Sequence, residues 1–352
     1  MPRLSASRKK RKVKRRENYL WKKIARFSLI FVVFLLSFAF LTSYSVYKII
    51  TQKDVDASGY SNLDLNSNYL PTMSFIVVDS FENDPVKLEK VEYFVIDRQN
   101  KKVLVFNVPL DLEIDVAGNY STEEFSKTFA LGGLTKEDKL FGGVALVEKT
   151  LFRIFGYKPY NYILIEKDIL KAFEKFLHEG DIPPLTSINA LYNLKDLVKS
   201  DLSVGEYYDL YKFLNSLPSD RFIKNEVTRS HIDNYKIFND MFYDLTITSV
   251  VAQEKKNIAV LNGTNISGLA SFGSRVVENI GGRVVSSDNS LEHWEDSVLI
   301  VDDPNSETVR YLVHTFGIQT VINKEDALEY RDSEIERADI TIIIGFDIGS
   351  SL

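Results

Sequence analysis

The chain has 352 residues, with 43 Lys and Arg, 49 Asp and Glu, and a formal net charge of −6. It contains no cysteine, which excludes disulfides, thiolate metal sites and cysteine nucleophiles. Its four histidines form no pair at i, i+3 or i+4, so we expect no metal site built on histidine.

Basic residues crowd the N-terminus, and an apolar stretch follows them. Residues 1–26 hold twelve Lys or Arg and one acid, whereas Phe27–Tyr47 carries no charge. A helix of this length spans roughly 30 Å, which matches the hydrocarbon core of a bilayer. Because flanking Lys and Arg stay on the cytoplasmic side, we predict a basic cytoplasmic tail over 1–26 and a single transmembrane helix over 27–49. The remainder would be extracytoplasmic.

Two other interpretations of this N-terminus compete with an anchor. A cleavable signal peptide usually has a shorter apolar region and small residues at its exit, whereas this stretch leaves through Tyr44, Val46 and Tyr47. A basic tail can also bind nucleic acid, but beside a membrane span it more often contacts anionic lipid heads. We therefore expect an uncleaved signal-anchor, the lipid bilayer as a partner, and no nucleic acid.

The part beyond the tail is strongly acidic. By subtraction from the totals, residues 27–352 carry 31 basic and 48 acidic groups, a net charge of −17. A surface of this kind binds an anionic ligand only through a local cluster of Arg or Lys.

A polar linker over residues 50–70 precedes the first predicted strands. Ser74–Ser80 and Val91–Asp97 are short runs rich in Val, Ile and aromatic residues, and Arg98–Lys101 joins the second run to Lys102–Leu110 in a predicted hairpin. Because the first two runs are apolar on both faces, we expect central strands covered by helices.

Helical and extended patterns then alternate along the chain. The predicted helices cover residues 136–156 and 168–180, a segment after Pro183 and Pro184 that extends to Val198, and residues 203–216, the last opened by a capping box at Ser203 and Glu206. The predicted strands cover residues 160–166, 221–228 and 243–250. A hydrophilic boundary at residues 251–257 follows.

The C-terminal part, residues 257–352, shows a regular α/β rhythm. Ile258–Gly263 is a predicted strand and Ser267–Ile280 a helix, followed by three or four more strands with interleaved helices. Asn262, Gly263 and Gly268 are the candidate ligand-binding residues here, because a strand that enters a glycine-bearing turn before a helix can cradle a phosphate. The competing interpretation is a tight turn, with positive φ at Asn262 and Gly263 and with Ser267 capping the helix.

The segment IAVLNGTNISGLASFGSRVVENIGGRVV, with the closing ADITIIIGFD, resembles the LytR C-terminal domain of bacterial envelope proteins. Residues 71–250 resemble a divergent LytR-CpsA-Psr domain through DRQNKKVLVFNVPLDLEI, FSKTFALGG and SDLSVGEYYDLYKFL. The resemblance implies two extracytoplasmic α/β domains, the first with a mixed central sheet. Active family members transfer a polyprenyl-pyrophosphate-linked glycopolymer to the cell wall, using arginines for the diphosphate and acidic side chains for Mg²⁺.

The chain departs from the family pattern where that chemistry resides. The arginine of the Pro-Arg-Asp motif is replaced by Leu110, and the Arg-Ser-Asp segment corresponds to Lys87-Leu88-Glu89. A later family aspartate falls on or beside Tyr160, and an arginine-bearing insertion is replaced by the short EGDIPPL segment. Leucine cannot form a bidentate contact with a phosphate, so we expect the chain to lack the contacts that bind the diphosphate in active family members.

We therefore expect a membrane-anchored cell-envelope protein, non-catalytic and without a cofactor, that binds or scaffolds in cell-wall assembly. Its expected partners are wall glycan, a polyprenyl-linked carrier or another envelope protein. The alternative is a phosphotransferase with a rewired site built on Lys87, Glu89 and Asp111, which would need Mg²⁺. A third interpretation is a tethered regulator that acts through the basic tail. For Asp111 itself, a carboxylate that caps the turn after Pro109 competes with a metal ligand.

Overall fold

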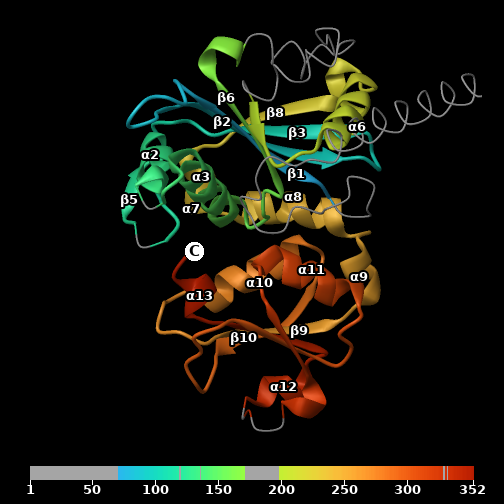
Figure 1. The fold of residues 1–352 in the computed structure, drawn as a ribbon. Helices are drawn as coiled ribbons and strands as arrows, with labels where there is room; N and C mark the ends of the chain where they lie inside the picture. The colour runs from blue at the N-terminus through green and yellow to red at the C-terminus, as the bar shows by residue number, and fades with distance from the viewer. Residues whose placement is uncertain (1–69, 119, 135, 171–197, 328–329, 331) are drawn as a thin grey trace, which may run out of the picture. The chain divides into compact units, whose positions relative to one another are not determined.

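The structure is a computed structural model that describes residues 70–352, except 119, 135, 171–197, 328–329 and 331. Residues Lys53–Leu352 form one compact unit. The described part contains a six-stranded and a five-stranded mixed sheet, which confirms the α/β class and the mixed central sheet (Figure 1). The tail at 1–26, the transmembrane helix at 27–49 and the linker up to residue 69 lie outside the described residues. From Leu70 onward, no described helix combines the length and apolarity needed to cross a bilayer.

The six-stranded sheet has the order β7-β6-β1-β2-β3-β8. Its strands are β1 (Thr72–Val78), β2 (Leu88–Asp97), β3 (Lys102–Asn107), β6 (Asn161–Glu166), β7 (Val198–Ser200) and β8 (Phe222–Glu226). β2 is antiparallel to both β1 and β3, whereas β6 is parallel to β1 and β8 is parallel to β3. Strands β1, β3, β6 and β8 therefore run in one direction, and their carboxyl ends meet at one edge of the sheet.

Burial of both faces explains the apolar character of the central strands. Every residue of β1 is buried, as are the last seven residues of β2, so the predicted pair of central strands is confirmed. The predicted β2–β3 hairpin is also confirmed. Its turn has Lys101 at φ 50°, and the Asp97 carboxylate accepts hydrogen bonds from the backbone and side-chain nitrogens of Asn100 at 3.0 and 2.8 Å.

Helices cover the two faces of this sheet. Helix α3 (Lys139–Phe155) begins at Asp138, whose carboxylate accepts from the backbone N–H of Phe141, and ends at Gly156 with φ 63°. It shares one face with α8 (Lys236–Thr246), and α6 (Val204–Asn215) lies on the other. The capping box at Ser203 and Glu206 is confirmed. The smaller elements are β4 (Glu113–Asp115), β5 (Thr122–Glu124), α2 (Thr128–Gly133) and α7 (Arg229–Asp233).

The strand predicted over residues 243–250 is wrong. The chain there completes α8, and α9 (Val250–Glu254) follows in place of the predicted hydrophilic boundary. The physical reason is a spacing of four: Phe238, Phe242 and Thr246 lie on one helical face and are all buried, which outweighs the β-branched residues at the end of the segment. The helix predicted up to Val198 falls mostly outside the described residues, and Val198–Ser200 is strand β7.

The five-stranded sheet has the order β10-β9-β13-β11-β12. Its strands are β9 (Asn257–Asn262), β10 (Arg283–Asn289), β11 (Val298–Val301), β12 (Thr320–Asn323) and β13 (Ile340–Ile344). Its helices are α10 (Leu269–Asn279), α11 (Glu307–Phe316), α12 (Ser333–Arg337) and α13 (Phe346–Gly349). The predicted alternation of strands and helices in this part is confirmed.

One hydrophobic core joins the two sheets. Tyr157 and Tyr160, which precede β6, are buried, and their hydroxyls hydrogen-bond to Tyr311 and Thr315 of α11. The Nδ2 atom of Asn279 in α10 donates to the carbonyls at the end of α3. The described residues therefore pack as two sheets around shared helices.

Candidate functional site

The carboxyl edge of the six-stranded sheet brings the predicted site residues to one side of the fold. Lys87 and Glu89 lie where β2 begins, and Asp111 follows β3. Ligands of open α/β sheets commonly bind beyond the carboxyl ends of the strands. This edge is the candidate site, and it divides into a β1–β2 side and a β3–β8 side.

On the β1–β2 side, acidic side chains accept hydrogen bonds or form ion pairs that stabilise the fold. The Asp79 carboxylate accepts from the backbone N–H groups of Ser80 and Lys87, at 2.8 and 2.9 Å, and from Asn83 Nδ2. Burial alone would raise the pKa of Asp79, but these hydrogen bonds outweigh it and lower that pKa. Asp79 therefore stabilises the conformation of the β1–β2 loop.

The predicted candidates on this side face solvent. Glu89 pairs with Lys167 at 3.5 Å, with both side chains about half exposed, and such pairs contribute little to stability. The Lys87 side chain is exposed and makes no ion pair within the described chain. Neither residue forms a hydrogen bond or ion pair with Asp111. The structure thus places the three candidates at one edge without joining them.

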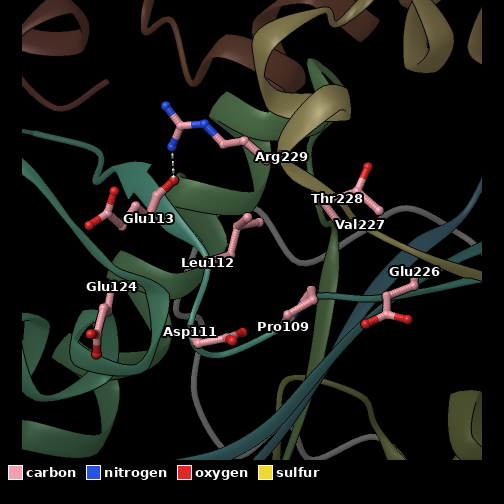
Figure 2. A pocket seen from close by; sticks show the side chains of 9 residues that line it. All are labelled: Pro109, Asp111, Leu112, Glu113, Glu124, Glu226, Val227, Thr228 and Arg229. Atoms are coloured by element: carbon pink, nitrogen blue, oxygen red, sulfur yellow. Dashed lines mark hydrogen bonds between the residues drawn. The ribbon is translucent and has the colours of Figure 1, made fainter.

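An open surface pocket of about 620 Å³, called the cavity below, lies on the β3–β8 side. Figure 2 shows its lining, which comes from the chain after β3, the β4–β5 ribbon, the end of β8 and the start of α7. The lining residues are Pro109, Asp111, Leu112, Glu113, Glu124, Glu226, Val227, Thr228 and Arg229. The lining therefore contains four carboxylate side chains and one guanidinium.

The backbone on both sides of Asp111 is held in place. The carbonyls of Leu110 and Leu112 accept hydrogen bonds from the N–H groups of Ser126 and Phe125, at 2.8 and 2.9 Å. Leu110 packs against the core. The exposed Asp111 side chain makes no hydrogen bond or ion pair with any described residue, so it does not cap the turn.

The single guanidinium of the cavity is engaged by the protein. Arg229 donates from Nη1 to the carbonyl of Glu113 at 2.8 Å (Figure 2) and from Nε to Asp233 at 3.1 Å. Arg229 therefore connects α7 to β4. Within the described ranges, no group of three or more His, Asp or Glu is placed to hold a metal ion. The cavity as built offers hydrogen-bond acceptors rather than fixed positive charge.

Tyr160 and the glycine pair, two further positions singled out from the sequence, have structural roles. Tyr160 is buried, which raises its pKa to about 12, and it contacts Thr315. Gly132 and Gly133, the two glycines that close the FSKTFALGG segment, end helix α2. Gly132 lies directly against the backbone of Gly142 in α3, an approach that only glycine permits.

The candidate ligand residues of the second sheet form a closed turn. Asn262 Oδ1 accepts from the backbone N–H and the hydroxyl of Thr264, at 3.0 and 2.8 Å, and its Nδ2 donates to the carbonyl of Ile266. Gly263 lies against Trp294, where a Cβ would overlap the indole. The positive φ predicted for Asn262 and Gly263 belongs instead to Gly268, at 87°, which replaces Ser267 as the N-cap of α10.

Two ionisable residues with shifted pKa values, Glu148 and Lys158, were missed by the sequence reasoning. Glu148 of α3 accepts from the hydroxyl of Ser74, and Lys158 donates to the carbonyl of His314. Burial, followed by repulsion from Asp201, raises the pKa of Glu148 to about 8. Burial lowers the pKa of Lys158 to about 8 as well. A sequence feature could have revealed Glu148, because this residue lies within the apolar stripe of its helix.

The acidic side chains of the cavity beyond Asp111 were also missed. Glu226 is the last residue of β8, and Glu124 ends β5. The rule that sites gather at carboxyl ends of strands could have selected Glu226 once β8 was known to be parallel to β3. That pairing is not encoded in the local sequence.

No family model and no curated protein matches this chain. Solved structures do resemble it. "TagT bound to LI-WTA" has a TM-score of 0.38 at 11% identity, over 55% of this chain and 99% of that chain. TagV of B. subtilis has a TM-score of 0.35 at 10% identity, over 46% and 85%. The "LytR-CPS2A-psr family protein YwtF (TagT) with bound octaprenyl pyrophosphate lipid" has a TM-score of 0.32 at 12% identity, over 50% and 87%.

The solved structures that the chain resembles are thus LytR-CpsA-Psr proteins, the family named from its motifs. At these identities the likeness assigns no ligand and no reaction to this chain.

Proposed function

We propose that this chain is a membrane-anchored extracytoplasmic protein of the LytR-CpsA-Psr type that binds wall glycan without transferring it. The observation that carries the proposal is the composition of the cavity beside Pro109 and Asp111. Four carboxylates line it, and its one guanidinium is bound to Glu113 and Asp233.

The charge of the cavity lining favours wall glycan over a polyprenyl-pyrophosphate carrier as the ligand. A pyrophosphate needs converging positive charge, and each missing contact of this kind costs about 2–4 kcal/mol of transition-state stabilisation. In this cavity a pyrophosphate would meet carboxylates and be repelled. Sugar hydroxyls donate hydrogen bonds, and carboxylates accept them strongly. The cavity therefore suits a glycan better than a polyprenyl-pyrophosphate carrier.

The test is a binding and transfer measurement on the full-length chain in detergent. Calorimetric titration with soluble peptidoglycan fragments should show binding that Glu226→Gln weakens several-fold, whereas geranyl pyrophosphate with Mg²⁺ should not bind. Lys224→Gln, on the same exposed strand but outside the cavity, serves as the matched control. Transfer or hydrolysis of a polyprenyl-pyrophosphate-linked glycan that depends on Mg²⁺ would refute the proposal.

A rewired phosphotransferase is the second candidate, and the exposed, unpaired Asp111 side chain favours it. In that case Asp111→Ala should abolish transfer while the free energy of unfolding stays unchanged. The same transfer assay therefore separates the two functions.

A further inference from the structure

Helix α8 has two apolar faces, of which only one is covered. Its inner face buries Phe238 and Phe242 in the core. On its outer face Ile237 and Tyr243 are 51% and 57% exposed, and Ile247, directly after the helix, is 54% exposed. Three of the nine exposed large hydrophobic side chains of the described residues thus gather within eleven positions. Such a concentration marks a contact surface rather than scattered surface residues.

The exposed residues of the outer face are arranged symmetrically about Asp240. In a helix, residues three and four positions apart are neighbours on one face. Ile237 and Tyr243 lie three residues before and after Asp240, and Lys236 and Asp244 lie four residues before and after it. All five side chains belong to the exposed face. The pattern places an apolar residue and a charge on each side of the centre, with opposite charges at the two ends.

This order is self-complementary. In an antiparallel pair with a two-fold axis at Asp240, Ile237 of one copy meets Tyr243 of the second copy, and Lys236 meets Asp244. Each of these contacts occurs twice, as an isologous interface requires. We propose that a second copy of this chain covers the outer face of α8 through antiparallel α8–α8 pairing. This proposal is independent of the function assigned to the cavity.

Charge complementarity selects the second copy over a different partner. The residues beyond the tail carry a net charge of −17, but salt screens such long-range repulsion beyond about 8 Å. At contact distance, the two Lys236–Asp244 pairs outnumber the single Asp240–Asp240 repulsion. One helix face buries less than the roughly 1,200 Å² of a standard interface, so the association is weak and suited to chains concentrated in a membrane.

The absence of native cysteine makes the test specific. The full-length chain with Asp240→Cys, in membrane vesicles under mild oxidation, should form a disulfide-linked dimer, because a residue on the two-fold axis lies close to its own copy. Glu336→Cys, at an exposed acid on α12, is the matched control and should react at least several-fold more slowly.

Exchanging the charges of Lys236 and Asp244 tests whether the partner is a second copy of this chain. In the Asp240→Cys background, Lys236→Glu and Asp244→Lys should each slow cross-linking several-fold, and the two changes together should restore it. Unchanged thermal unfolding would show that the variants fold. Equal reactivity of the two cysteine variants would overturn the proposal. So would failure of the double variant to restore cross-linking, because it would show that Lys236 and Asp244 of two copies do not face each other.

Discussion

Glu148 is a carboxyl group whose protonation couples stability to pH. Its pKa is raised from 4.5 to about 8, mainly by burial and then by Asp201. Between these values the folded protein holds a proton that the unfolded chain releases. The free energy of unfolding therefore falls as pH rises through this range, by at most about 1.4 kcal/mol per pH unit.

Glu148→Gln should remove this slope. Glutamine can still accept the hydrogen bond from Ser74 but does not titrate. Urea denaturation of residues 53–352 from about pH 5 to about pH 7.5 measures the effect. Lys158 acts with the opposite sign and only above about pH 8, because its pKa is lowered from 10.5. Glu325→Gln, at an exposed carboxylate, is the control, and an unchanged slope in Glu148→Gln would contradict the assignment.

The crossing of α2 and α3 depends on backbone contact between two glycines. A Cβ on Gly132 would overlap the carbonyl oxygen of Gly142, and a Cβ on Gly142 would overlap that of Gly132. In a free helix, Gly→Ala is favourable by about 1 kcal/mol. Here overpacking, which typically costs about 1–3 kcal/mol, opposes that gain.

Gly132→Ala should therefore lower the free energy of unfolding by up to about 2 kcal/mol, as measured by the urea midpoint at constant m-value. Gly133→Ala is the matched control. Its Cβ would lie 3.3 Å from the carbonyl oxygen of Lys139, a contact that a small shift relieves. Equal effects of the two substitutions would show that the helices do not meet at Gly132.

At the scale of the whole molecule, the two sheets should unfold together. Asn279 of α10 donates to the carbonyls of Phe155 and Gly156, at 3.2 and 3.1 Å, and thereby caps the end of α3. Asn279→Ala leaves these carbonyls without this donor, which costs about 1–3 kcal/mol.

Fluorescence and circular dichroism test this cooperativity. In residues 53–352, Trp294 is the single tryptophan and reports on the second sheet, whereas far-ultraviolet circular dichroism reports on both. The two transitions should coincide, and Asn279→Ala should shift both equally. Two separated transitions would mean that the sheets are independent domains.

Local pattern was sufficient for most elements. The apolar runs of β1 and β2, the capping box at Ser203 and Glu206, and the strand–helix alternation after residue 257 all follow from nearest-neighbour chemistry. It failed at residues 243–250, where burial of Phe238, Phe242 and Thr246 on one face outweighed β propensity.

The sequence by itself determined the charge balance and the absence of thiol chemistry. Only the tertiary structure decided which carboxylates line the same cavity. The parallel pairing of β3 with β8 joins residues more than one hundred positions apart and brings Glu226 to the cavity beside Asp111. Such pairing depends on long-range packing, since hydrophobic periodicity specifies which face of a strand is buried but not which strand lies next to it.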